Sequence, residues 1–365
     1  QELEKALRTA AEADVAVIFA GLPEIFESEG YDRTSMKLPK CQDRLIEEVL
    51  KVQPNVVVVL HNGSPVELPW ADRVSAILEM YLGGQGVGEA CDRLLFGEAN
   101  PSGRLAETFP YRLEDNPSFL HFPGNGKRVL YGEDIFVGYR YYDTKKVPVR
   151  YAFGHGLSYT EFTYGDLTLS SAQMTDEDIL TVSLKVKNSG KTEGKEVVQL
   201  YVADLCGTPE RPVKELKGFA KVHLLPGEEK TVSMEISARD LSYYEERLGD
   251  WYAPSGTYRI LIGHASDDIR LHADVVFETK KKLPLRVDFT TTFGELLDHT
   301  KTAPVITELL APLAAAAASA EGMSDEYKKL GEQVIREMPL KSLLGQMPGE
   351  QVEQLIGQLN CLLAQ

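Results

Sequence analysis

The chain has 365 residues, which at roughly 150 residues per domain is enough for two or three domains. Hydrophobic residues make up 43% and charged residues 26%, a globular balance that excludes intrinsic disorder as the dominant state. The formal net charge of −16 repels phosphate groups, so we expect neither nucleic acid nor a membrane surface as a partner. No apolar run approaches the roughly 20 residues that cross a bilayer, and Gln1 to Glu4 show no signal-peptide pattern.

The cysteines and histidines give no sign of a metal or redox centre. Four scattered cysteines form no CxxC pair, so we expect isolated reduced thiols and hence a cytoplasmic location. The seven histidines show no HxxxH or HExxH spacing, so we predict no metal site and infer no cofactor.

Residues 1–110 alternate helical and strand patterns, which predicts an α/β sandwich domain. Apolar strands are expected at 15–20, 56–60 and 74–81, with a helix at 40–51. The continuous run at 56–60 indicates a strand covered on both faces. A helix after 83–88 is expected to turn these residues inward: Ala90, Cys91, Leu94 and Leu95. Three strands are few for a doubly wound sheet, so this domain is either small or incomplete.

The remaining chain divides into three further segments. Residues 111–157 are rich in Pro, Gly, Asn and aromatics, and we expect an ordered connector. The aromatics at 139–142 either form a sugar platform or, the interpretation we favour, pack between domains. Residues 158–280 alternate with period two, which predicts a fibronectin III-like β-sandwich of about seven strands. Residues 281–365 form a helical tail whose apolar faces must dock on something.

The most informative segment is ESEGYDR at residues 27–33, directly after the first predicted strand. Ligands meet α/β sheets at the carboxyl ends of strands. The loop concentrates three carboxylates, a glycine, an aromatic ring and an arginine, so one interpretation is a proton-donating acid beside an aromatic platform. A solvated acidic turn is the other. The glycines at 83–88 run GxGxG rather than GxGxxG, which disfavours a nucleotide-binding protein. No GxSxG elbow supports a serine triad.

Several stretches together resemble glycoside hydrolase family 3, the family of many β-glucosidases. Their order and spacing match from about residue 5 to 277. They are ESEGYDR at 27–33, LFGEANPSGRL at 95–105, VGYRYYD at 137–143, FGHGLSYT at 153–160 and ELKGF at 215–219.

The resemblance implies a three-part enzyme. A barrel carries the aspartate nucleophile, an α/β sandwich supplies the acid/base glutamate, and a fibronectin III-like domain braces both. Here the resemblance covers only the C-terminal part, without the barrel, and we expect the α/β sandwich to be incomplete. The expected partners are therefore a β-glucoside or oligosaccharide substrate and the N-terminal barrel domain of the same enzyme.

The implied mechanism is retaining hydrolysis, in which two carboxyl groups about 5 to 5.5 Å apart share the work. The family's Glu-Gly pair maps onto Glu29 and Gly30, so Glu29 is the expected acid/base, with Glu27 as the fallback. Burial and a neighbouring charge are expected to keep its proton in place. Tyr31 resembles the family's aromatic at the leaving-group subsite. Asp32 and Arg33 are expected to brace the loop as an ion pair.

A chain with the acid but no nucleophile should hydrolyse glycosides poorly by itself. We therefore expect the C-terminal portion of a retaining β-glycosidase that acts on terminal β-D-glucosyl residues. The alternative is a non-catalytic carbohydrate-binding or scaffold module, which predicts sugar binding that does not depend on Glu29.

Overall fold

The computed structural model describes residues 1–208, 211–318 and 324–364, which fall into two compact units. The first comprises Gln1–Tyr243 with Tyr252–Lys280, and the second Tyr244–Trp251 with Lys281–Gln365. Within these described ranges, no helix is long and apolar enough to cross a membrane. Nor do three or more potential metal-binding side chains gather anywhere in that part of the chain.

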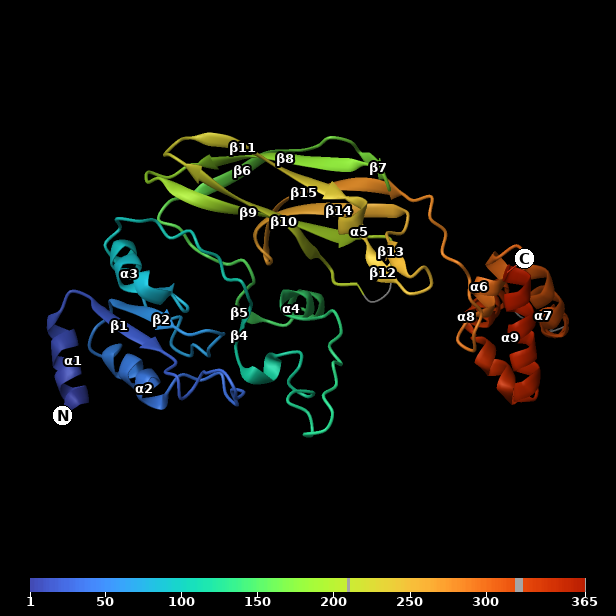
Figure 1. Cartoon of the computed structure of the whole chain (residues 1–365), viewed down its shortest axis with the longest axis horizontal. Helices are drawn as coiled ribbons and strands as arrows, with labels where there is room; N and C mark the ends of the chain where they lie inside the picture. Colours follow the sequence, from blue (N-terminus) through green and yellow to red (C-terminus); the bar gives the residue numbers. More distant parts are fainter. Residues whose placement is uncertain (209–210, 319–323, 365) are drawn as a thin grey trace. The chain divides into compact units, whose positions relative to one another are not determined.

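A three-stranded parallel sheet forms the centre of the α/β part (Figure 1). Its strands are β1 (Ala16–Gly21), β2 (Val56–His61) and β3 (Ala76–Glu79), in that order across the sheet. The helices α1 (Glu2–Glu12) and α2 (Lys40–Val49) bury apolar side chains with one face of this sheet. Because β2 lies between the other two strands, its valines are largely buried, as the apolar run predicted.

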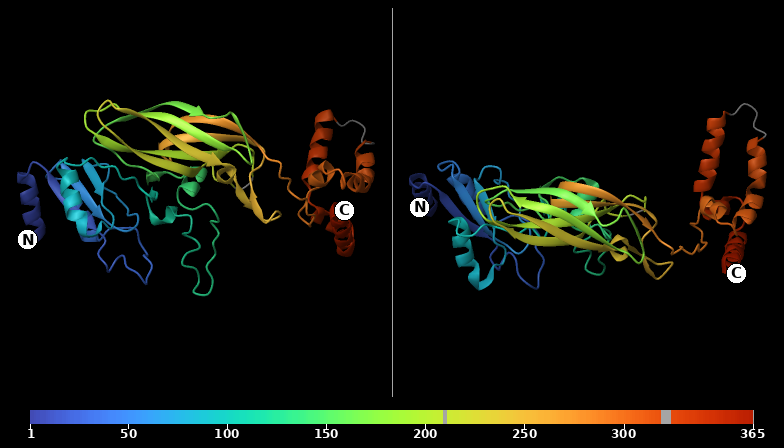
Figure 2. Two further views of the ribbon diagram at one scale, coloured as in Figure 1. Left: turned by 45° about the horizontal axis from the view of Figure 1, so that its top comes forward. Right: turned by 90° about the horizontal axis from the view of Figure 1, so that it is seen from above.

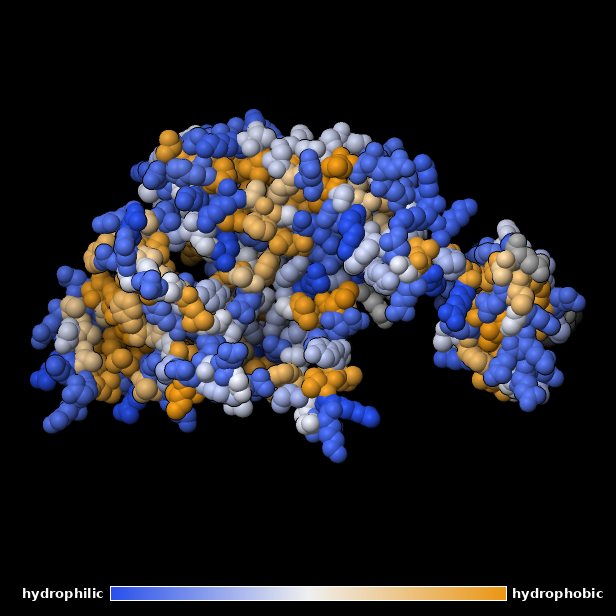
Figure 3. Space-filling view, viewed as in Figure 1, coloured by the Kyte–Doolittle hydropathy of each residue, from blue (hydrophilic) through white to orange (hydrophobic). Residues whose placement is uncertain are grey.

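The other face of the sheet is open at β1. Val17 and Phe19 are 42% and 60% exposed, so the strand is covered on one face only. The helix α3 (Val87–Leu95), which follows the short helix η1 (Gly84–Gly86), buries only Cys91. The prediction of four inward side chains on α3 was therefore wrong, because Ala90 is exposed and Leu94 and Leu95 are half-buried. Figure 3 shows apolar residues gathered around the β1 region.

The connector contains β4 (Phe109–Pro110), η2 (Leu113–Asp115), α4 (Tyr139–Lys145) and β5 (Val149–Tyr151), and β4 pairs with β5. Tyr139 stacks on Phe153 with ring centroids 4.7 Å apart. Its hydroxyl also accepts a hydrogen bond from the backbone N–H of Leu216 at 2.7 Å. These contacts support the packing interpretation of the aromatic cluster, because they hold α4 against the neighbouring β-sandwich.

The β-sandwich consists of a five-stranded and a three-stranded sheet (Figure 2), and β12 and β13 form a separate short pair between α5 and β14 in the chain. The larger sheet has the order β10-β9-β14-β15-β7 and the smaller one β11-β8-β6. Ten strands are therefore described here, against about seven expected, because short pairings add to the main ones. The inward residues of both sheets share one core that includes Leu184, Leu200 and Ile260. The element bounds are β6 (Phe162–Leu169), β7 (Gln173–Thr175), β8 (Ile179–Asn188), β9 (Gly194–Asp204), β10 (Glu215–Leu224), β11 (Glu229–Ser237), α5 (Ala238–Leu241), β12 (Tyr243–Glu245), β13 (Asp250–Tyr252), β14 (Gly256–Ala265) and β15 (Asp268–Glu278).

The second unit is helical and has a core of its own. Its elements are α6 (Phe293–Asp298), α7 (Ala303–Ala318), α8 (Asp325–Glu337), η3 (Leu340–Gly345) and α9 (Gly349–Ala364). Thr292 starts α6 with a reciprocal capping box to Glu295, which satisfies backbone donors at the helix start. Leu296, Ile306 and Leu359 are fully buried in this core, so apolar side chains of α6, α7 and α9 pack on one another.

Candidate active site

Polar side chains gather where the three parallel strands end. The loop after β1 carries Glu27, Glu29 and Arg33, β2 leads into Asn62 and Ser64, and β3 ends on Glu79. Because the strands are parallel and in register, their carboxyl ends meet at one edge of the sheet. This edge is the position that the sequence predicted for the functional loop.

Glu27 anchors the loop to the end of β2. One carboxylate oxygen accepts a hydrogen bond from the backbone N–H of Gly63 at 2.6 Å, and the other accepts from the Ser64 hydroxyl at 2.6 Å. Arg33 lies 3.3 Å from the same carboxylate. Burial alone would raise the pKa of Glu27, but the two hydrogen bonds and the charge of Arg33 outweigh it and hold the pKa below its usual value. Glu27 is therefore a fixed carboxylate with the role of a brace, which argues against its use as the fallback proton donor.

Glu29 lies two residues further along and is exposed. Among the described residues, none makes a hydrogen bond or ion pair with its side chain. Gly30 adopts a φ of +94°, a left-handed conformation that side chains disfavour, although a Cβ there would meet no atom within 4 Å. The glycine is thus needed for the path of the backbone and not for space. The burial that we expected around Glu29 is not provided by the described residues.

Tyr31 and Arg33 complete the loop. The Tyr31 hydroxyl donates a hydrogen bond to the backbone carbonyl of Glu24 at 2.5 Å, while the residue as a whole is 48% exposed. Arg33 does brace the loop, but the expected partner was wrong. It pairs with Glu27 and donates to the Ser64 hydroxyl at 2.6 Å, whereas Asp32 is exposed.

Two further carboxyl groups escaped the sequence analysis. Glu79 accepts hydrogen bonds from the backbone N–H of Tyr81 at 2.9 Å and from the Asn62 amide at 3.3 Å. Burial is the main reason that the pKa of Glu79 is raised to about 7. Burial and the charge of Glu27 also raise the pKa of Glu107. The sequence did hold a signal for Glu79. This residue is the last of the apolar strand β3, and the loop glutamates likewise follow the apolar strand β1.

Two models of known protein domains match stretches of this sequence. Residues 1–159 match the glycosyl hydrolase family 3 C-terminal domain, and residues 196–266 match the fibronectin type III-like domain. The chain belongs to glycoside hydrolase family 3. Both the expected fold class, an α/β part followed by a fibronectin III-like sandwich and C-terminal helices, and the resemblance to the C-terminal part of β-glucosidases are confirmed.

Curated relatives in family 3 share the sequence over most of the chain. Thermostable beta-glucosidase B of Acetivibrio thermocellus is 47% identical over 98% of this chain, which spans 48% of that protein. The beta-glucosidase of Kluyveromyces marxianus is 46% identical over 74% of this chain and 32% of its own length. The chain thus spans from about a third to about a half of the length of these relatives.

Solved structures show the same fold. A crystal structure of the Kluyveromyces marxianus beta-glucosidase in complex with glucose superimposes with a TM-score of 0.72 at 44% identity, covering 76% of this chain and 33% of that one. The Bifidobacterium adolescentis GH3 beta-glucosidase gives a TM-score of 0.76 at 39% identity, covering 83% of this chain and 45% of that one.

Proposed function

We propose that this chain is the C-terminal portion of a retaining β-glucosidase and that Glu29 is its general acid/base. In the first step Glu29 donates its proton to the glycosidic oxygen while a carboxylate of an N-terminal barrel attacks the anomeric carbon. In the second step the Glu29 carboxylate takes a proton from the water that releases the sugar. The substrate is a terminal β-D-glucosyl residue, as the names of the relatives suggest.

The observation that carries this proposal is the contrast between two glutamates on one loop. Glu27 is held by Gly63, Ser64 and Arg33, so it accepts hydrogen bonds but has no proton to give. Glu29 extends from the loop that Glu27 braces and is engaged by no described side chain. Because Glu27 fixes the loop and Glu29 extends from it, this arrangement supports Glu29 as an outward-facing catalytic group.

The nucleophile and the cover over Glu29 come, in this proposal, from the N-terminal barrel domain. The carboxyl groups of Glu27, Glu79 and Glu107 at this edge have partners or lie buried in this chain. The exposed face of β1, with Val17 and Phe19, is apolar surface of the kind that marks an interface. A further part of the enzyme that packs near this edge would bury Glu29 and favour its protonated form.

The test uses the chain alone and the chain joined to the N-terminal part of a family 3 β-glucosidase, such as that of Acetivibrio thermocellus. We expect the chain alone to leave p-nitrophenyl β-glucoside unhydrolysed and the joined protein to hydrolyse it. In the joined protein, Glu29→Gln should lower kcat/KM by about 10²- to 10⁴-fold, the usual contribution of general acid–base catalysis. With a dinitrophenyl glucoside, Glu29→Gln should lower the rate of the first step less, because the dinitrophenolate leaving group departs without a proton.

Glu24→Gln is the matched control, since Glu24 is an exposed glutamate on the same loop. It should leave activity unchanged. A joined protein in which Glu29→Gln retains full activity, while Glu27→Gln loses more activity on the nitrophenyl glucoside than on the dinitrophenyl glucoside, would assign the acid role to Glu27. Rapid turnover by the 365-residue chain alone would show that the nucleophile lies within it.

A further inference from the structure

A network of hydrogen bonds joins the ends of the parallel strands to the loop that carries Glu29. Asn62 is fully buried after β2, and its amide nitrogen donates to the Ser64 carbonyl at 3.1 Å and to the Glu79 carboxyl at 3.3 Å. The Ser64 hydroxyl in turn donates to Glu27 at 2.6 Å. We call Glu79, Asn62, Ser64 and Glu27 the strand-end network. It connects a carboxyl on β3 to the carboxylate that fixes the loop after β1.

Glu79 is also held from the chain that follows β3. The backbone N–H of Tyr81 donates to the Glu79 carboxyl at 2.9 Å, and Tyr81 itself has a φ of +47°. Residues other than glycine rarely adopt this left-handed conformation, and they keep it only where the surrounding structure enforces it. Burial raises the pKa of the Tyr81 phenol above its usual value, so the phenol stays neutral. The Glu79 carboxyl is therefore held between strand β3 and a constrained backbone N–H.

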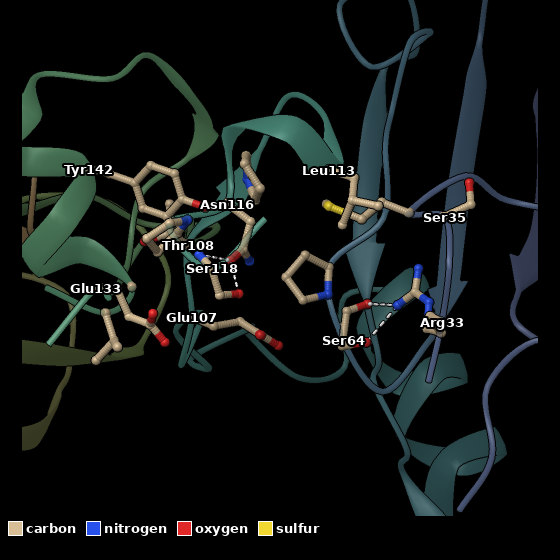
Figure 4. A pocket seen from close by; sticks show the side chains of 16 residues that line it. Arg33, Ser35, Ser64, Glu107, Thr108, Leu113, Asn116, Ser118, Glu133 and Tyr142 are labelled. Carbon is tan, nitrogen blue, oxygen red and sulfur yellow. Dashed lines mark hydrogen bonds between the residues drawn. The ribbon is translucent and has the colours of Figure 1, made fainter. Parts of the chain in front are cut away.

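The carboxyl groups around Glu79 oppose its ionisation. Burial is the largest cause that raises its pKa to about 7, and the charges of Glu107 and Glu27 add to it. The nearby cation, Arg33, lies 3.3 Å from Glu27 and donates to the Ser64 hydroxyl (Figure 4). No cation among the described residues forms an ion pair with Glu79. The Glu79 carboxyl thus changes its charge near neutral pH, next to a carboxylate that is already ionised.

The interaction between Glu79 and Glu27 acts in both directions. Because the charge of Glu27 opposes the ionisation of Glu79, an ionised Glu79 disfavours the position of Glu27 to the same extent. Water screens this repulsion poorly where the groups are buried. Glu27 lies on a loop, whereas Glu79 ends a strand, so the loop is the part that yields. An ionised Glu79 therefore favours detachment of Glu27 from Gly63 and Ser64.

We propose that Glu79 is a positioning residue for the loop at residues 27–33. Its neutral carboxyl keeps the strand-end network closed on Glu27 and so holds the base of Glu29 in place, and its ionisation loosens this attachment. What the loop does in catalysis rests on the proposed function, whereas the attachment itself is a property of the 365-residue chain alone.

The test is the protection of the Gly63 amide against hydrogen exchange, followed by NMR on the 365-residue chain from pH 6 to pH 8. This N–H donates to Glu27, so it exchanges faster when Glu27 detaches. We expect its protection factor to fall by up to about tenfold, because the protonated fraction of Glu79 falls by that factor over this range. Glu79→Gln keeps the shape without the charge, and its protection factor should stay constant. All proteins carry His61→Gln, which removes the histidine two residues before Gly63.

Glu67→Gln is the matched control. Glu67 is likewise a half-buried glutamate whose pKa is raised by burial, but none of its charged neighbours belongs to the strand-end network. This variant should show the same pH dependence at Gly63 as the parent. The amide of Val58, within β2, reports unfolding of the whole domain and should lose less protection than Gly63.

A second variant keeps the test decisive if far-UV circular dichroism shows that Glu79→Gln is not folded. Ser64→Ala removes the hydroxyl between Asn62 and Glu27, so it should weaken the pH dependence at Gly63.

The joined protein described above gives a readout that a role in the fold alone would not change. The ratio of kcat for Glu79→Gln to kcat for the parent should rise by up to about tenfold from pH 6 to pH 8, with little change in KM. A purely structural role would lower the amount of active protein without this pH dependence.

Four results would overturn the proposal: a Gly63 protection factor that does not change with pH in the parent, the same response in Glu79→Gln or Ser64→Ala as in the parent, loss of the response in Glu67→Gln, or equal loss of protection at Val58. These results would leave the proposed function untouched. Full activity of Glu29→Gln, with the Gly63 response intact, would instead contradict the proposed function and leave the positioning role in place.

Discussion

Two glutamates at the carboxyl edge of the α/β sheet, Glu27 and Glu79, have pKa values that are shifted in opposite directions. Glu27 receives hydrogen bonds from Gly63 and Ser64 and the charge of Arg33, so its carboxylate form is favoured despite burial. Glu79 also receives two hydrogen bonds, but burial outweighs them and the neighbouring Glu107 and Glu27 add repulsion. The difference is the cation, because only Glu27 has an arginine within ion-pair distance. The environment of Glu27 therefore favours the ionised carboxylate, and that of Glu79 favours the protonated carboxyl group.

Glu79 should make the first unit less stable as the pH rises. Its pKa is about 7 in the folded chain against 4.5 for the unexceptional group, so the folded state holds more protons between these values. Stability from this group is complete below about pH 4.5 and is lost as the pH rises through 7, in total about 3 kcal/mol. Glu79→Gln removes the titration. The free energy of unfolding of the parent should therefore fall relative to that of the variant across this window.

The measurement is denaturant unfolding followed by the fluorescence of the buried Trp70, in a Trp251→Phe background, at a series of pH values. Glu12→Gln, at the exposed end of α1, is the matched control and should give a difference that does not change with pH. A constant difference for Glu79→Gln as well would show that the pKa of Glu79 is the same in the folded and the unfolded chain.

At the scale of elements, a buried charge network connects the segment after α3 with the β-sandwich. Glu196 on β9 is fully buried and accepts hydrogen bonds from Arg104 at 2.9 Å and from the Tyr164 hydroxyl at 2.8 Å. His264 on β14 lies 2.7 Å from the same carboxylate through Nδ1, and its Nε2 lies 2.9 Å from the Gly156 carbonyl. Burial would raise the pKa of Glu196, but His264 and Arg104 lower it below the usual value. The network joins residues up to 108 positions apart.

Arg104→Met should destabilise the first unit strongly. Removing the Arg104 guanidinium takes a charged partner from the buried carboxylate of Glu196, and breaking a buried pair typically costs about 3 to 5 kcal/mol. Arg259→Met is the matched control, because Arg259 forms a two-contact pair with Asp274 on the exposed surface of the same sandwich. Such exposed pairs contribute about 0 to 1 kcal/mol. Equal losses in denaturant unfolding for the two variants would contradict a structural role for the buried network.

Local sequence patterns predicted the helices and strands, but they could not predict which residues far apart in the chain contact one another. The valine run of β2 and the alternation of β8 each place their own side chains, so period and composition were sufficient. The inward face of α3 was predicted from the helix alone and was wrong, since whether Ala90 is covered depends on elements elsewhere.

The same distinction applies to the candidate site. The place of Glu29 on a strand-end loop followed from sequence order, and its role remains a prediction. The bracing of Glu27 needs Ser64, 37 residues further along, and no spacing rule links the two. Arg33 was paired with its neighbour Asp32 on proximity in sequence, but the guanidinium instead reaches the buried side of the loop, where Glu27 and Ser64 lie.

At the scale of the whole molecule, the net charge and the exposed apolar surface have opposite effects on association. A net charge of −16 opposes association, while the open face of β1 exposes Val17 and Phe19. The helical unit has a core formed by its own helices, and on α8 it also exposes Tyr327, Leu330 and Val334. Because each of the two units has a buried apolar core of its own, we expect each to unfold in a separate transition.

Leu296→Ala should lower the stability of the helical unit alone. Leu296 is fully buried on α6, and truncating such a side chain costs about 2 to 5 kcal/mol through lost burial and the cavity left behind. Differential scanning calorimetry should show one transition moving to lower temperature while the other stays in place. Leu184→Ala, in the core of the β-sandwich, is the reciprocal variant and should move the other transition. If either substitution shifted both transitions equally, the two units would unfold as one, and the helical tail would contribute directly to the stability of the domains that carry the candidate active site.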